Sequence, residues 1–169
     1  MAPERSRCLV LACGNTLRGD DGVGPWLAGW AGERFRNEPG VRVISRQQWT
    51  PELAQDIART EAVLFLDCAL DAAPGAVTLR TVEVHAQSGA TATHHLAAPE
   101  LLALAEELYR AHPRAVLFTI GGESFGLGDE FSDALRAALP QACASLETAV
   151  LRLLDSAAIV DCRGSHLQR

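Results

Sequence analysis

The feature that most constrains the fold is an alternation of short apolar runs with longer amphipathic stretches. The apolar runs have the composition of strands buried on both faces of a sheet, and the clearest lie at 8–13, 62–66 and 115–120. Apolar residues recur at helical spacing in the stretches 22–35, 51–59, 99–110 and 131–154. This alternation predicts an α/β fold: a three-layer, doubly wound, mainly parallel sheet with helices on both faces.

Two weaker segments complete the expected sheet. Residues 41–45 have a short strand pattern, and residues 76–85 alternate as a half-exposed strand does. The second segment follows the run at 62–66 after a short turn, so it is a candidate antiparallel strand. We find no linker and no repeat, and we expect a single domain over 1–169. No periodic pattern continues over 156–169, so we expect a disordered tail there.

The composition argues against several classes of protein. The 169 residues suffice for one domain with a sizeable core. The net charge is −6 and the 15 basic residues are spread thinly, which argues against a nucleic-acid partner. No apolar stretch approaches the roughly 20 residues that span a bilayer, so we expect no membrane partner. The five cysteines form no CxxC pair and the N-terminus has no secretory pattern, so we expect a reduced, cytoplasmic protein. We also expect the protein to be a monomer.

Acidic and imidazole side chains follow three of the expected strands. Asp20 and Asp21 end the loop after the first strand, Asp67 ends the strand at 62–66, and His94 and His95 end a small polar loop after the fourth strand. The carboxyl ends of parallel strands meet at one edge of the sheet, where ligands bind in such folds. Two carboxylates and one imidazole would form an incomplete shell for a divalent transition metal, with the vacant positions left to water or substrate.

Each of these residues also has a plainer interpretation. One of the two adjacent aspartates could cap the helix that begins near Gly22, while the other points elsewhere. Asp67 could form an Asx-turn, and a histidine in a polar loop is commonly just solvated. The glycines around Asp20 and Asp21 suggest a phosphate-binding loop, but no lysine-containing phosphate-loop motif accompanies them. Cys13 and Cys68 flank the same edge, and we interpret them as packing residues rather than nucleophiles.

Four segments together resemble the nickel–iron hydrogenase maturation endopeptidases. The stretch 14–24, GNTLRGDDGVG, resembles the family signature G-N-x-L-x-x-D-(D/E)-G-x-G. The stretch 64–69 is similar to the family's hydrophobic strand that ends in an aspartate, and 93–96, THHL, to its Ser/Thr-His-x-Leu before a helix. The stretch 126–132 is similar to the segment before the family's last helix. The resemblance covers essentially the whole chain, in order.

The resemblance implies a cytosolic endopeptidase that removes a C-terminal extension from a hydrogenase large-subunit precursor after nickel insertion. The implied catalytic and metal-binding residues are Asp21, Asp67 and His94; the His-x-Leu spacing selects His94 and makes His95 the variable position. The nickel would be presented by the substrate, so no cofactor is implied at rest. Residues 47–50 replace a Gly-Gly-Thr turn that in the family is implied to touch the substrate, so we expect Trp49→Ala mainly to weaken precursor binding.

Two rival functions remain open on the sequence. The first is a non-catalytic accessory module that binds a metal or a nucleotide. The second is a small phosphoryl-transfer or nucleosidase-like hydrolase on the same fold, which would need a basic phosphate pocket that the sequence does not show.

Overall fold

The computed structural model describes the backbone of residues 6–84 and 96–163, and side chains as far as residue 155. One five-stranded sheet has the order β2-β1-β3-β5-β4. The strands are β1 (Ser6–Cys13), β2 (Val41–Arg46), β3 (Thr60–Ala69), β4 (Val77–Thr81) and β5 (Arg114–Gly121). The helices are the 3-10 turn η1 (Gly19–Gly22), α1 (Val23–Arg34), α2 (Leu53–Ala58), α3 (Ala98–Tyr109) and α4 (Asp133–Arg163).

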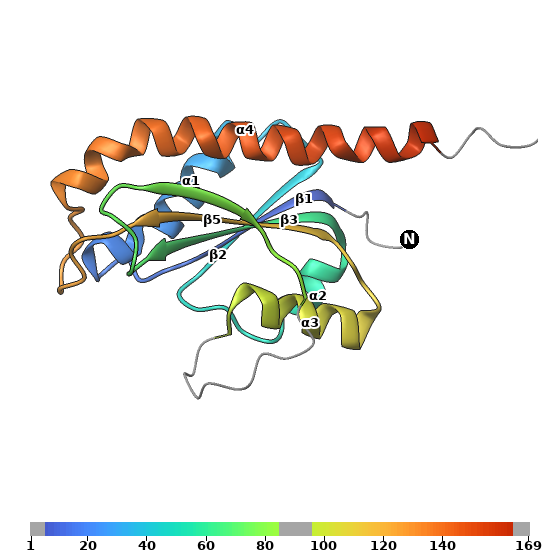
Figure 1. Cartoon of the computed structure of the whole chain (residues 1–169), viewed down its shortest axis with the longest axis horizontal. Coiled ribbons are helices and arrows are strands. Elements are labelled where there is room, and N and C mark those ends of the chain that lie inside the picture. The colour runs from blue at the N-terminus through green and yellow to red at the C-terminus, as the bar shows by residue number, and fades with distance from the viewer. Residues whose placement is uncertain (1–5, 85–95, 164–169) are drawn as a thin grey trace, which may run out of the picture.

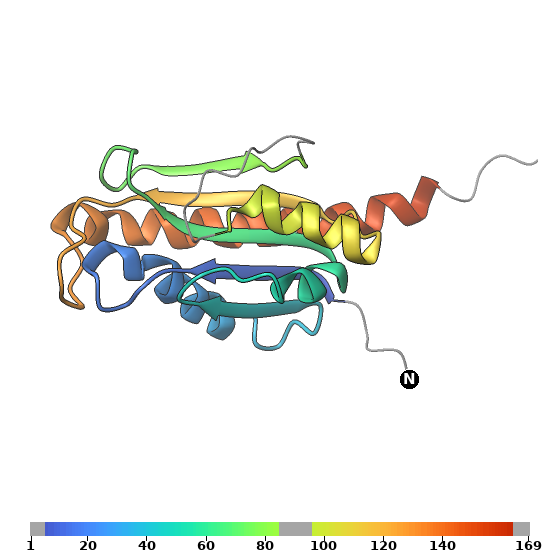
Figure 2. The ribbon, with the colours of Figure 1, turned by 90° about the horizontal axis from the view of Figure 1, so that it is seen from below.

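Two hydrophobic cores lie on opposite faces of the sheet. Along β1, Cys8 and Val10 belong to the core under α1 and α4, whereas Leu9 and Leu11 belong to the core under α2 and α3. Successive side chains of a strand point to opposite faces, so an unbroken apolar run fills both cores at once. Figures 1 and 2 show α1 and α4 on one face and α2 and α3 on the other. The predicted three-layer α/β class is confirmed.

The edge strand β4 is the one antiparallel member of this sheet. It pairs with β5, with Thr78 opposite Thr119, although it follows β3 in the chain. The other neighbouring pairs, β1 with β2, β1 with β3 and β3 with β5, are parallel. Only Val77 of β4 is half-buried and the rest of the strand is exposed, which agrees with its half-polar sequence pattern.

Three element boundaries differ from the sequence prediction. β3 runs on to Ala69 because β5 stays paired with it to the end, so Asp67 lies inside the strand rather than after it. α2 begins at Leu53, so Pro51 precedes the helix instead of opening it. α4 continues to Arg163, so part of the tail expected over 156–169 is helical, and 164–169 lie outside the described residues. No helix in the described ranges is long and apolar enough to cross a membrane.

The order of the strands creates a topological switch point at one edge of the sheet. The chain passes from β1 to β2 on one side, and it returns to the other side of β1 to form β3. The connections that leave β1 and β3 therefore diverge, and ligands bind at such switch points in open α/β sheets. Asp21 follows β1 and Asp67 lies near the carboxyl end of β3, so both are at this point.

Candidate active site

The loop after β1 is shaped by a glycine and an asparagine. Gly14 has φ +146°, and a Cβ there would lie 2.0 Å from the backbone oxygen of Asp21, so the loop can fold back this closely only over glycine. The side-chain Oδ1 of Asn15 accepts a hydrogen bond from the backbone N–H of Leu17 at 2.9 Å, which makes an Asx-turn. The backbone N–H of Asn15 donates to Oδ2 of Asp21 at 2.8 Å. The Gly-Asn pair thus holds the Asp21 carboxylate in place.

Helix α1 begins directly against the ends of the two central strands. A Cβ on Gly24 would lie 2.2 Å from the carbonyl oxygen of Cys13 and 3.4 Å from that of Leu66. The absence of a side chain therefore lets the first turn of the helix rest on β1 and β3. This close packing fixes where the η1 turn, and with it Asp21, stands relative to Asp67.

Asp67 is held by two donors on the same oxygen. Its Oδ1 accepts a hydrogen bond from the Cys13 thiol at 3.3 Å and from the backbone N–H of Cys68 at 2.8 Å. Burial raises the pKa of Asp67, the two hydrogen bonds lower it in part, and the negative charge of Asp21 raises it further. The net effect is a raised pKa, to which the charge of Asp21 contributes least.

The two carboxylates have the same arrangement. In each, one oxygen is held by a backbone N–H, at Asn15 for Asp21 and at Cys68 for Asp67. Neither Oδ1 of Asp21 nor Oδ2 of Asp67 receives a hydrogen bond from any residue within 6–84 or 96–155. Oriented carboxylates with one oxygen to spare can bind a cation, accept a proton from water, or accept a hydrogen bond from a substrate.

The two thiols beside the site are held in the protonated form. Burial, with the neighbouring charge of Asp67, raises the pKa of the Cys13 thiol far above its ordinary value. Burial and the charges of the aspartates raise the pKa of Cys68 to about 12. A protonated thiol is a poor nucleophile and a poor metal ligand, which agrees with the interpretation of both cysteines as packing residues. Cys13 has a further role that the sequence did not reveal, because its S–H orients Asp67.

Asp20 has a role different from that of its neighbour. It is fully buried, and its carboxylate accepts hydrogen bonds from the backbone N–H groups of Glu123, Ser124 and Ser132 and from the Ser132 hydroxyl, at 2.7–3.0 Å. Neither aspartate caps α1, which has no side-chain cap. Asp20 instead binds the N-terminus of α4, so it ties two loops together and is not available to a substrate.

Two further sequence predictions meet different outcomes. His94 and His95 lie outside the described residues, so the structure does not place the expected imidazole ligand. Trp49 is buried in the core and packs edge-on against Phe65, with ring centroids 5.2 Å apart. Trp49→Ala would therefore disturb the core, and the expectation that it mainly probes precursor binding is wrong. Within the described residues, no group of three or more His, Cys, Asp and Glu side chains is arranged to hold a metal ion.

Comparisons with known proteins return one consistent group. No protein-family model matches the chain and no curated protein matches its sequence. Among solved structures, the hydrogenase 2 maturation peptidase from a Thaumarchaeota archaeon is 25% identical, with a TM-score of 0.62 over 86% of this chain and 98% of that one. The NiFe hydrogenase maturation protease HybD from Thermococcus kodakarensis is 25% identical, with a TM-score of 0.61 over 85% and 98%. The hydrogenase maturating endopeptidase HybD from E. coli is 21% identical, with a TM-score of 0.65 over 86% and 93%, and at that identity the match shows the fold alone.

The site and the comparisons lead to the same family. The signature over 14–24 forms the loop that holds Asp21, and the strand motif over 64–69 carries Asp67 at the switch point. The three solved structures named above share this fold across nearly their whole length, and each is named as a maturation peptidase, protease or endopeptidase. The chain has the fold of the hydrogenase maturation proteases, and its similarity to two of them at 25% identity supports a peptidase.

Proposed function

We propose that this peptidase removes the C-terminal extension of a nickel–iron hydrogenase large-subunit precursor once nickel has been inserted. Asp21, Asp67 and His94 would bind the nickel that the precursor already holds, and the scissile peptide bond would thereby be docked beside the carboxylates. The nickel is thus part of the substrate. The observation that supports this most is the pair of half-held carboxylates at the switch point, each with one oxygen to spare.

The open shell accounts for selectivity. A nickel ion held by substrate thiolates keeps vacant coordination positions, and carboxylate oxygens with an imidazole nitrogen can fill them. A precursor without nickel offers no ion to bind, so its extension would stay in place. The backbone N–H groups of Asn15 and Cys68 would fix the carboxylates before the substrate arrives, which lowers the entropy lost on docking.

The reaction itself is the addition of water to the scissile carbonyl, with the proton passing to the leaving amine. Two alternative mechanisms are compatible with the same residues. In one, the substrate's nickel polarises the carbonyl or the attacking water. In the other, an aspartate takes the proton of the water, and nickel serves only for recognition. The raised pKa of Asp67 suits it to the role of base in the second.

The decisive experiment is incubation with a precursor subunit, with and without nickel, read by mass. The wild-type chain should trim only the nickel-loaded precursor. Asp21→Asn, Asp67→Asn and His94→Ala should each block trimming while the circular dichroism spectrum is unchanged. His95→Ala is the matched control and should still trim. Full processing by His94→Ala would contradict the ligand assignment, and a chain that binds metal or nucleotide tightly but never trims would favour the accessory module.

A further inference from the structure

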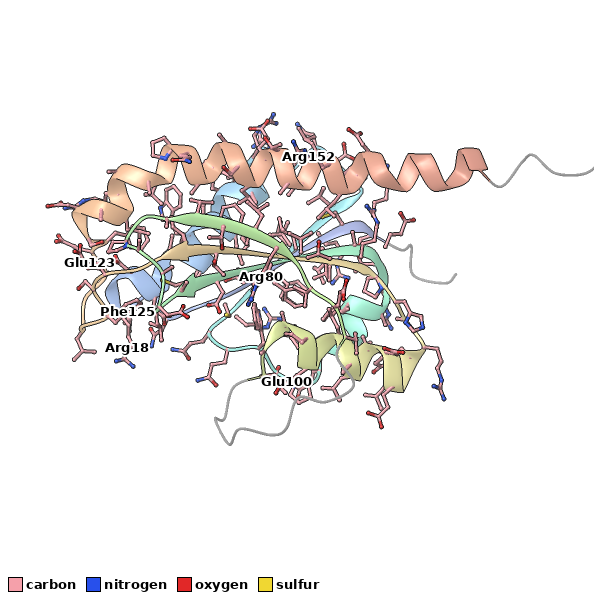
Figure 3. All side chains as sticks on the ribbon, in the orientation of Figure 1. Arg18, Arg80, Glu100, Glu123, Phe125 and Arg152 are labelled. Carbon is pink, nitrogen blue, oxygen red and sulfur yellow. The ribbon has the colours of Figure 1, made fainter. Side chains whose placement is uncertain are left out.

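Hydrogen bonds join two loops at the carboxyl edge into one unit, which we call the docking platform and define as residues 15–20 and 123–132. The N–H of Gly19 donates to Gly128 at 2.8 Å, and the N–H of Gly128 donates to Leu17 at 3.0 Å. The N–H of Asp20 donates to the backbone oxygen of Ser124 at 2.8 Å, and the Asp20 carboxylate adds the bonds described above. Figure 3 shows Arg18, Glu123 and Phe125 of this platform together at one end of the molecule.

The platform exposes large apolar side chains. Leu127 is 95% exposed and Leu17 is 64% exposed, on backbone segments that are hydrogen-bonded to each other. Trp26 is 42% exposed and extends the apolar surface, because its ring packs edge-on against Phe131 with ring centroids 6.4 Å apart. Neighbouring apolar side chains exposed on a fixed backbone are typical of interaction sites.

A hollow of about 500 Å³ opens in the same platform. Phe131 lines it with an aromatic surface, and Asp129 and Glu130 line it with carboxylates. Within the platform, Arg18 is the one basic residue, whereas Glu123, Asp129 and Glu130 are acidic. Arg136, just outside the platform, forms an ion pair with Asp133 and also interacts with the charge of Glu130. The hollow therefore suits a long basic side chain, whose methylene groups would lie on the ring and whose charge would face the acids.

We infer that the docking platform binds a folded region of the precursor, through an apolar contact on Leu17 and Leu127 and a lysine or arginine in the hollow. This inference rests on the proposed function. Continuity with the candidate active site supports it, because Asn15 bonds both to Leu17 in the platform and to Asp21 in the site. A precursor whose scissile bond reaches Asp21 would therefore come close to Leu17.

The test measures binding directly, in an Asp67→Asn background that cuts nothing. The ligand is a nickel-loaded hydrogenase large-subunit precursor, and the readout is its Kd by isothermal titration calorimetry. Leu17→Ser with Leu127→Ser should raise the Kd about tenfold. Asp129→Asn with Glu130→Gln should also raise the Kd about tenfold and flatten its dependence on salt, because screening then has less attraction to weaken. The control pair, Glu107→Gln with Leu108→Ser, alters an exposed acid and an exposed leucine on α3, and should leave the Kd unchanged.

The outcomes separate this inference from the proposed function. A higher Kd in both platform variants supports the docking platform. This conclusion stands even if the wild-type chain cannot cut the bound precursor and the peptidase proposal fails. An unchanged Kd in both variants overturns the platform while trimming by the wild-type chain stands. A wild-type chain that does not bind the precursor also overturns it. A dimer that Leu17→Ser with Leu127→Ser converts to monomer, without change in Kd, would assign the surface to a second copy and overturn it as well.

Discussion

Replacing Asp20 by alanine should destabilise the fold more than any other single change at the two adjacent aspartates. The side chain is fully buried, and three backbone N–H groups and one hydroxyl donate to it. Alanine would leave the N–H groups of Glu123, Ser124 and Ser132 without an acceptor. An unsatisfied buried donor costs roughly 1–3 kcal/mol. The lower end applies here because the side chains of Glu123 and Ser124 are exposed, so water can reach this loop.

The expected loss for Asp20→Ala is therefore about 3 kcal/mol in the free energy of unfolding, from three donors at about 1 kcal/mol each. For a chain of this length that corresponds to a fall in Tm of about 6–12 °C. Urea unfolding at pH 7 measures it, with Asp71→Ala as the control because Asp71 is an exposed loop aspartate. A loss of less than about 1 kcal/mol would refute the assignment of Asp20 as the tie between the loops.

The same network predicts a pH dependence. Burial alone would raise the pKa of Asp20, but the hydrogen bonds from Glu123, Ser132 and Ser124 together outweigh it, so the folded-state pKa is lowered. The stabilisation from the ionised form is therefore fully present above the unfolded pKa of about 3.9, and is lost as pH falls through the lower folded value. The gap in stability between the wild-type chain and Asp20→Asn should stay constant near pH 7 and shrink below about pH 4. A gap that widens in acid would contradict this reasoning.

Three further predictions concern the site and its packing. Asp67→Asn should block trimming, yet it should stabilise the fold by about 0.5–1 kcal/mol at pH 7. Burial raises the pKa of Asp67, so the folded state is destabilised by the charge that asparagine lacks. A lower urea midpoint for Asp67→Asn than for the wild-type chain would instead make Asp67 a structural residue. Gly24→Ala should destabilise the fold by about 2 kcal/mol or more, because its Cβ would overlap the Cys13 carbonyl. Gly29→Ala lies on the same helix with open space around it, and should stabilise the fold by about 0.5–1 kcal/mol. A higher Tm for Gly24→Ala than for Gly29→Ala would contradict the close packing of α1 on the strands. Cys13→Ala should lower kcat and shift the acidic limb of the pH–rate profile to higher pH, because the thiol hydrogen bond that lowers the pKa of Asp67 is lost. Cys13→Ser should restore both the kcat and the profile. Equal profiles for the two variants would argue against a positioning role for Cys13.

The sequence alone determined the fold class and most of its elements. Strands such as β1 are apolar on consecutive positions, which is possible only where both faces are buried, so the layered sheet followed from the pattern. The motif over 14–24 carried the resemblance to the maturation endopeptidases, and its glycines have a physical reason. A Cβ at Gly14 or Gly24 would lie 2.0 or 2.2 Å from a backbone oxygen, so both positions favour glycine. The position of Asp21 and Asp67 at the carboxyl edge followed from the parallel topology.

Tertiary structure alone decided which aspartate does what. Asp20 and Asp21 are adjacent and chemically identical, so no local pattern separates them. Only the segment between β5 and α4, more than a hundred residues away in the chain, supplies the donors to the buried carboxylate of Asp20, whereas Asp21 is held by the nearby N–H of Asn15. The same is true of the Cys13 thiol on Asp67, of the buried position of Trp49, and of the pairing of β4 with β5 rather than β3. These depend on contacts between segments distant in sequence, and a local pattern carries no information about such contacts.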